Sequence, residues 1–168
     1  GAIFSDRTDE LVATVYLDDR PRIYWRNAEW ERDYETLKEQ LPELDVSLGA
    51  STLDERLQIV NASGDREPGV TYLFDRESDE LTMLYRIRER LPREHLAEQT
   101  PVRYESSDGL EIPAYLTLPK GVEGRDLPAV VVPHGGPWGR DRWGYDTIAQ
   151  FLANRGYAVL QPNFRGST

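Results

Sequence analysis

The residues with the clearest potential for chemistry are those of the sequence HGGP, His134 to Pro137, which directly follows an apolar run at residues 129–133. Gly135 and Gly136 have no Cβ atom, so they permit positive φ and allow a ligand to approach the backbone closely. Their N–H groups can then stabilise the oxyanion that forms when a carbonyl carbon is attacked. One such donor typically lowers the barrier by roughly 2.7–4 kcal/mol. The alternative is a tight turn without a catalytic role. We favour the oxyanion loop because a strand pattern precedes it and a helical pattern follows it.

The segments around this motif have the order strand, loop, helix, strand. Residues 128–133 form an uninterrupted run rich in valine, which predicts a strand buried on both faces of a mainly parallel sheet. An amphipathic helix is predicted at residues 145–156, with Gly156 as its C-cap, and a further strand at residues 157–164. The apolar stripe of that helix consists of Tyr145, Ile148, Phe151 and Leu152. This order favours a parallel strand pair with a right-handed crossover, and open α/β sheets bind ligands at the carboxyl ends of their strands.

The residue that would attack is not found in the sequence. Hydrolases with such a loop carry a serine in the pattern Gly-x-Ser-x-Gly, together with an aspartate and a histidine. No serine of the chain has this pattern, and Ser167 is one residue from the end. His134 belongs to the loop motif, and His95 lies in a charged segment where we expect a solvated side chain. The chain therefore offers no nucleophile for such a loop, and we expect these 168 residues alone to have no hydrolase activity.

The first half of the chain has the pattern of short strands joined by polar turns. Strands are predicted at residues 10–19, 21–25, 55–63, 69–75 and 81–87. In the last of them, side chains that alternate on one side indicate core packing: Leu81, Met83, Tyr85 and Ile87.

One helix interrupts these strands, from Ala28 to Leu41, with Asn27 as its N-cap and Pro42 after its end. Its apolar stripe, at helical spacing, consists of Trp30, Tyr34, Leu37 and Leu41. The charged residues of the opposite face are expected to be solvated rather than to bind a ligand. These are Glu29, Glu31, Arg32, Glu35 and Glu39.

The composition excludes several classes of protein. A net charge of −10 makes a nucleic-acid partner unsuitable, because such binding depends on lysine and arginine neutralising phosphates. Two histidines and no cysteine leave little material for a metal site. No apolar run approaches the roughly 20 residues that span a bilayer. The first residues lack the pattern of a signal peptide, and we expect no membrane association. The acidic composition and the absence of cysteine favour a cytoplasmic location.

The character of the sequence changes near Leu91, where charged residues and prolines separate two regions. A hairpin with its turn at residues 107–109 follows this boundary.

The chain resembles the prolyl oligopeptidase family of serine peptidases, in particular its acylaminoacyl-peptidase and dipeptidyl-peptidase-like branch. Three features carry the resemblance in order: the hairpin SSDGLEIPAYLTLP, the HGGP loop, and the sequence FLANRGYAVLQPNFRGS. Upstream, GVTYLFDRESDELTMLYR resembles a closing hairpin of that family's β-propeller.

The resemblance implies a mixed fold of two parts. Residues 1–91 would be the C-terminal blade or blades of a β-propeller with an inserted helix. Residues 92–168 would be a linker and the incomplete N-terminal part of an α/β-hydrolase catalytic domain, so the chain would be a fragment. The order of catalytic residues in the family implies that the serine, aspartate and histidine of the triad lie beyond Thr168.

The resemblance also implies roles for the loop residues. Gly136, or its neighbour Gly135, would offer the oxyanion N–H, with His134 and Pro137 framing the loop. Trp138 would form a wall of the substrate pocket, or alternatively pack against the propeller. In the sequence NFRGS, we expect Arg165 to be a buried salt-bridge partner.

The implied function is a serine peptidase that hydrolyses short peptides, of the acylaminoacyl or dipeptidyl type, through a seryl ester and without a cofactor or metal. Two alternatives stay open: an esterase-type α/β-hydrolase, and a non-catalytic propeller interaction module. The expected partners are a short peptide substrate and the remainder of the catalytic domain or a companion chain, with homo-oligomerisation as a further route.

Overall fold

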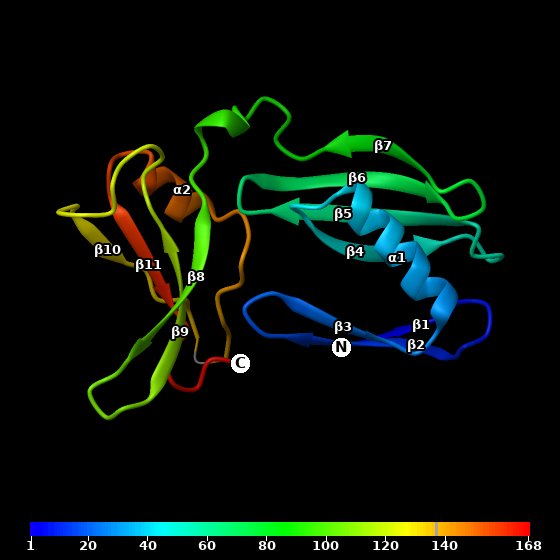
Figure 1. Ribbon diagram of the computed structural model, residues 1–168, viewed down its shortest axis with the longest axis horizontal. Helices are drawn as coiled ribbons and strands as arrows, with labels where there is room; N and C mark the ends of the chain where they lie inside the picture. The colour runs from blue at the N-terminus through cyan, green and yellow to red at the C-terminus, as the bar shows by residue number, and fades with distance from the viewer. Residues whose placement is uncertain (137) are drawn as a thin grey trace. The chain divides into compact units, whose positions relative to one another are not determined.

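The computed structural model describes residues 1–136 and 138–168, and the chain divides into two compact units, Gly1–Glu89 and Arg90–Thr168 (Figure 1). The division lies close to the change of character near Leu91. The first unit contains antiparallel strands and one long helix, and the second contains a mixed sheet with a short α-helix.

The first unit has two antiparallel sheets whose strands are paired in chain order. One has the order β1-β2-β3, and the other has the order β4-β5-β6-β7. Their bounds are β1 Ala2–Phe4, β2 Leu11–Leu17, β3 Pro21–Trp25, β4 Asp45–Ser51, β5 Leu57–Gly64, β6 Glu67–Asp75 and β7 Glu80–Arg86. Sequential pairing follows from the short polar connections, which bring each strand back beside its predecessor.

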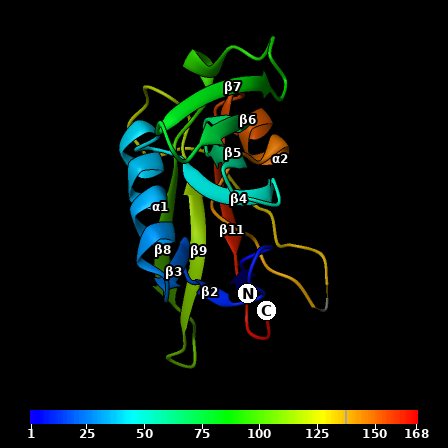
Figure 2. The ribbon, with the colours of Figure 1, turned by 90° about the vertical axis from the view of Figure 1, so that its right-hand side faces the viewer.

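Helix α1, Ala28–Gln40, covers one face of the four-stranded sheet (Figure 2). The side chain of Asn27 accepts hydrogen bonds from the N–H groups of Glu29 and Trp30, so the predicted N-cap is confirmed. Leu37 is fully buried and packs with Val46, Val60 and Phe74 of the sheet. Tyr34 and Leu41 flank this cluster, and Trp30 is also buried, which confirms the predicted apolar stripe.

Strand β7 is formed as predicted, but the core packing predicted for its alternating side chains is wrong. Met83 and Tyr85 are 55% and 58% exposed, and only Leu81 packs against the core. Strand β7 lies at the edge of its sheet, with β6 as its one partner among the described strands, and Met83 and Tyr85 lie outside the core cluster that Leu37 of α1 forms with the sheet. Alternation identifies a strand but does not reveal whether a layer covers its face.

The second unit contains a four-stranded sheet of order β10-β11-β9-β8. Its elements are the 3-10 helix η1 Arg93–His95, β8 Gln99–Glu105, β9 Glu111–Thr117, β10 Ala129–Val131, α2 Thr147–Ala153 and β11 Ala158–Pro162. Strands β10 and β11 are parallel, as predicted, with Val130 opposite Val159. The pairs β8/β9 and β9/β11 are antiparallel.

The prediction that β10 is buried on both faces is wrong for this chain. Val131 is 60% exposed, and Ala129 is also exposed. Strand β10 lies at the edge of the sheet and has β11 as its one partner among the described strands. A continuous apolar run predicts that a strand can be covered on both faces, but neighbouring elements decide whether it is covered.

Helix α2 turns a different face to the sheet from the one predicted. Its buried residues are Ala149, Gln150 and Ala153, whereas Ile148 and Phe151 are 56% and 55% exposed. Small residues allow the helix to pack closely on its neighbours, and the bulky side chains then point away. The predicted C-cap is two residues too late: the helix ends at Ala153 with Asn154 as its C-cap. Gly156, with a φ of +90°, lies in the turn that follows, and its N–H donates to the carbonyl oxygen of Ala153 over 3.0 Å.

Candidate functional site

The described residues of the HGGP motif, His134, Gly135 and Gly136, follow β10 and precede α2, as the sequence predicted. Because β10 and β11 are parallel, the segment after β11 begins at the same edge of the sheet. The described parts of the loop, residues 134–136 and 138–141, and the segment at residues 163–168 are therefore neighbours at the carboxyl edge, which is the position where open α/β sheets bind ligands.

Backbone and side-chain hydrogen bonds join these two segments. The N–H of Asp141 donates to Oδ1 of Asn163 over 2.8 Å, and Nδ2 of Asn163 donates to the carbonyl oxygen of Asp141 over 3.1 Å. The N–H of Thr168 donates to the carbonyl oxygen of Gly139 over 3.0 Å. Since Asn163 is buried, this reciprocal pair anchors the loop to the end of the sheet.

His134 is held by three contacts. Its ring stacks on Phe164, with 4.4 Å between ring centroids and 14° between ring planes. Nε2 is 2.7 Å from Oγ of Ser167, and Nδ1 is 2.9 Å from the carbonyl oxygen of Gly135. Two of these contacts come from the segment after β11, so the ring connects that segment to the glycine loop.

Gly135 and Gly136 are exposed, and no described acceptor receives a hydrogen bond from either N–H group. Neither residue has a positive φ, so the left-handed backbone conformation that glycine permits is not used at these two positions. A Cβ atom at Gly135 would meet no described atom within 4 Å. The chain itself therefore does not require glycine at position 135, and two amide donors remain exposed at the carboxyl edge of the sheet.

Asp141 is a half-buried carboxyl in this loop. Burial raises the pKa of the Asp141 carboxyl, the positive charge of His134 lowers it, and Asp146 raises it, with a net rise. Its Oδ2 atom is buried and has no hydrogen-bond partner among the described atoms.

The contact between His134 and Ser167 is not a catalytic pair of the serine-hydrolase type. Ser167 lies in a turn after β11, next to Gly166 with a φ of +90°, and not on a strand-to-helix elbow. Its hydroxyl also donates to the carbonyl oxygen of Phe164 over 2.7 Å. On the other side of the ring, Nδ1 contacts the carbonyl of Gly135 and not a carboxylate.

The remaining residues singled out in the sequence have mixed outcomes. Pro137 lies outside the described residues, and Trp138 is 80% exposed. His95 is exposed in η1, as expected for a solvated residue. The expectation of a buried partner for Arg165 is wrong: it forms an ion pair with Asp108, but both side chains are more than half exposed. The pair lies at the surface because Asp108 is in the β8–β9 turn.

Phe164 and Ser167 were missed as neighbours of the glycine loop. In the sequence NFRGS, a role was predicted only for Arg165, as a salt-bridge partner. The available signal was the parallel pairing itself, because two parallel strands bring the loops after their carboxyl ends to one edge.

The described residues offer neither a metal-binding cluster nor a membrane-spanning helix. In residues 1–136 and 138–168, no group of three histidine, cysteine, aspartate or glutamate side chains is placed to hold a metal ion. None of the described helices is both long and apolar enough to cross a bilayer.

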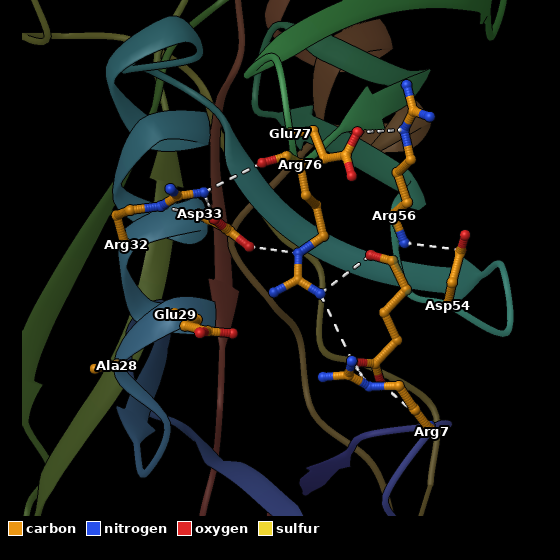
Figure 3. A pocket seen from close by; sticks show the side chains of 10 residues that line it. Arg7, Ala28, Glu29, Arg32, Asp33, Asp54, Arg56, Arg76 and Glu77 are labelled. Atoms are coloured by element: carbon orange, nitrogen blue, oxygen red, sulfur yellow. Dashed lines mark hydrogen bonds and ion pairs between the residues drawn. The ribbon is translucent and has the colours of Figure 1, made fainter.

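The first unit contains a charged pocket of about 520 Å³ that the sequence did not predict (Figure 3). It is lined by Arg7, Ala28, Glu29, Arg32, Asp33, Asp54, Glu55, Arg56, Arg76 and Glu77. Figure 3 shows the side chain of Arg76 extending into the pocket toward Asp33 of α1. Nε of Arg76 donates to Oδ2 of Asp33 over 2.5 Å, and Nη1 donates to the carbonyl oxygen of Glu55 over 3.1 Å.

All four arginines of this pocket are paired with carboxylates of the chain. Arg76 pairs with Asp33 and Glu55, Arg7 with Glu55, Arg32 with Asp33 and Asp79, and Arg56 with Asp75 and Glu77. Asp33 and Glu55 are buried, and the guanidinium of Arg76 lies 4.6 Å from the ring centroid of Trp30. The pocket is therefore a compensated ionic network that ties α1 to the sheets. Its signal in the sequence was Asp33, which stands on the same helical stripe as Trp30 and Leu37.

The chain is similar to known peptidases. No family model matches the chain. Among curated proteins, the chain is 40% identical over 181 residues to dipeptidyl aminopeptidase BIII of Pseudoxanthomonas mexicana, which covers 100% of the chain and 25% of that protein. The chain thus spans about a quarter of the length of this relative.

Solved structures share the fold at lower identity. An acylaminoacyl peptidase of Pyrococcus horikoshii has a TM-score of 0.57 and 21% identity, over 99% of this chain and 23% of that chain. A prolyl endopeptidase has a TM-score of 0.65 and 14% identity, over 99% of this chain and 24% of that chain. These similarities confirm the predicted fold class: propeller-type strands followed by the first part of an α/β-hydrolase sheet.

Proposed function

Because the chain belongs to the prolyl oligopeptidase family of serine peptidases, we propose that its glycine loop forms part of the oxyanion hole of a peptidase. One observation carries the proposal: the N–H groups of Gly135 and Gly136 are exposed at the carboxyl edge of the sheet, and no described acceptor occupies them. Preorganised backbone donors of this kind stabilise a developing oxyanion because they need not reorient during the reaction.

In this proposal the reaction is acyl transfer to a serine. The serine oxygen attacks the peptide carbonyl carbon, the amide N–H groups of the loop bind the resulting oxyanion, and the amine leaves as a seryl ester forms. Water then hydrolyses the ester. The nucleophile, the aspartate and the histidine are supplied by parts of the protein other than these 168 residues, which contain no Gly-x-Ser-x-Gly pattern.

The proposed substrates are short peptides, either acylated or free at the N-terminus. This class is supported by the names of the relatives, an acylaminoacyl peptidase and a dipeptidyl aminopeptidase. Trp138, which is 80% exposed beside the glycines, is proposed to form a wall of the substrate pocket.

We propose in addition that the exposed edge of β10 pairs with a further strand. Val131 is 60% exposed, and an apolar edge strand is prone to pair with another strand. The remainder of the catalytic domain, a companion chain or a second copy would supply that strand. A cytoplasmic location also stays a proposal.

The experiment compares proline and alanine at the two glycines in the full-length protein that contains this chain. Gly135→Pro and Gly136→Pro each remove one N–H donor, whereas Gly135→Ala and Gly136→Ala keep the donor and add one carbon. Neither alanine is expected to strain the loop, because neither φ is positive and no contact to the added carbon is shorter than 3.5 Å.

At the donor position we expect proline to lower kcat by about 100- to 1,000-fold relative to alanine, because one oxyanion donor is lost. Hydrolysis of acyl-peptide and dipeptidyl chromogenic substrates measures this. Equal activity of the proline and alanine variants at both positions would contradict the oxyanion role. A wild-type protein that cleaves esters but no amides would support an esterase, and a protein that cleaves neither would support an interaction module.

A further inference from the structure

The peptide unit between Gly135 and Gly136 has its carbonyl held by His134. Nδ1 of His134 is 2.9 Å from the carbonyl oxygen of Gly135. In a trans peptide the carbonyl and the following N–H point in opposite directions. A restraint on the carbonyl of Gly135 therefore also fixes the direction of the N–H of Gly136, which points away from the ring.

The hydrogen-bonding capacities of the partners determine where the ring proton lies. A carbonyl oxygen can only accept, so Nδ1 of His134 must carry the proton that this contact requires. In the neutral ring Nε2 is then an acceptor, and the hydroxyl of Ser167, which has one proton, turns from the carbonyl oxygen of Phe164 to donate to Nε2 over 2.7 Å. When the ring is protonated, Nε2–H donates to Oγ of Ser167, and the hydroxyl donates to the carbonyl of Phe164 over 2.7 Å. Ser167 can hold the ring in both states because a hydroxyl is both donor and acceptor.

The face of the ring is fixed independently of these hydrogen bonds. Phe164 stacks on it with a centroid separation of 4.4 Å. Gly139 limits the space around the carbonyl oxygen of Gly135, because a Cβ atom at position 139 would lie 3.1 Å from that oxygen. Any side chain at position 139 would therefore press on the carbonyl that His134 holds.

We infer that Ser167 and Phe164 are positioning residues: through His134 they orient the peptide unit at residues 135–136 and select the N–H of Gly136 as the oxyanion donor. This inference rests on the proposed function for its catalytic consequence, but its structural content is independent of it. The residues act through His134 and do not themselves touch the substrate.

The structural test is nuclear magnetic resonance of the 168-residue chain labelled with ¹⁵N-histidine. The chain has two histidines, and His95→Gln assigns both signals. We expect neutral His134 to be in the Nδ1–H tautomer, and Ser167→Ala to shift it toward the Nε2–H tautomer. Ser167→Thr should retain the wild-type tautomer, and Ser78→Ala, in the β6–β7 turn, should have no effect. A wild-type ring with Nε2–H, or one that does not respond to Ser167→Ala, would overturn the inference.

The kinetic test uses the same substitutions in the full-length protein. Ser167→Ala should lower kcat by about 5- to 10-fold with little change in KM, since the loss of one hydrogen bond weakens a contact that acts in the transition state. Ser167→Thr should restore kcat, and Phe164→Tyr should retain more activity than Phe164→Leu. An active wild type with unchanged kcat in Ser167→Ala would refute the positioning role alone. An inactive wild type would refute the proposed function, and the tautomer measurement would still decide the inference.

Discussion

Arg76 is the residue on which the charged pocket of the first unit depends. Its side chain is only 14% exposed and contacts two buried carboxylates, those of Asp33 and Glu55. If the arginine were lost, Asp33 would keep its ion pair with Arg32, and Glu55 its ion pair with Arg7, but these two arginines are 59% and 60% exposed. Removal of the buried member of an ion-pair network leaves buried charge that is poorly compensated, which is strongly destabilising.

We therefore predict that Arg76→Met destabilises the chain by about 3–5 kcal/mol. Arg56→Met is the matched control, because Arg56 pairs with Asp75 and Glu77 but is 50% exposed. That control should shift the unfolding midpoint little, because an exposed ion pair contributes little to stability. Urea unfolding followed by tryptophan fluorescence measures both, and similar shifts of the midpoint in the two variants would contradict this account of the pocket.

At the scale of elements, α2 is held by a polar side chain on its buried face. Gln150 accepts a hydrogen bond from the N–H of Ala97 over 2.9 Å and donates to the carbonyl of Ala97 over 2.8 Å. Both backbone groups are buried and would lose these bonds if the amide were removed. The bulky Ile148 lies on the exposed face and contributes little to this packing.

Gln150→Leu should therefore destabilise the second unit, by about 1–3 kcal/mol for each backbone group left unpaired. Ile148→Ser should change stability by no more than about 0.5 kcal/mol. Thermal unfolding followed by circular dichroism distinguishes the two variants. The apolar stripe expected from the sequence gives the opposite order, so a larger loss in Ile148→Ser would favour that arrangement over the observed one.

At the scale of the whole molecule, the excess of carboxylates gives a net charge of −10. Burial of Glu55 opposes its ionisation, but the hydrogen bond from Ser5 and other contacts hold its pKa below the ordinary value. The pKa of Asp75 is lowered chiefly by the hydrogen bond from Arg56, that of Asp54 by the bond from Thr52, and that of Asp108 by the bond from Ser106. Ionised carboxylates are therefore part of the folded state.

These directions fix the sign of the pH dependence. A carboxyl whose pKa is lower in the folded state stabilises it above the unfolded pKa, and this stability is lost as the pH falls through the folded pKa. We expect the unfolding midpoint in urea to be nearly constant down to about pH 5 and to fall below about pH 4. Ser5→Ala should reduce this acid dependence, because Ser5 donates to Glu55 over 2.6 Å. Stability that rises on acidification from pH 5 to pH 3 would contradict the prediction.

The sequence alone determined the features that depend on local patterns. Helical spacing, Asn27 and Pro42 identified α1, because a cap and a repeat near 3.6 residues act within one segment. Turn signals located the hairpins, and the HGGP motif after an apolar run located the glycine loop at a strand end. The resemblance carried the fold class, which the comparisons confirm.

Only the tertiary structure decided which surfaces meet. It exposed β7 and β10 as edge strands, turned Ile148 of α2 outward, and left Arg165 at the surface. It also joined His134 to Ser167 across 33 positions and Asp33 to Arg76 across 43. Side-chain periodicity records which residues share a face of one element, but burial and long-range hydrogen bonds depend on a second element whose position no local pattern contains.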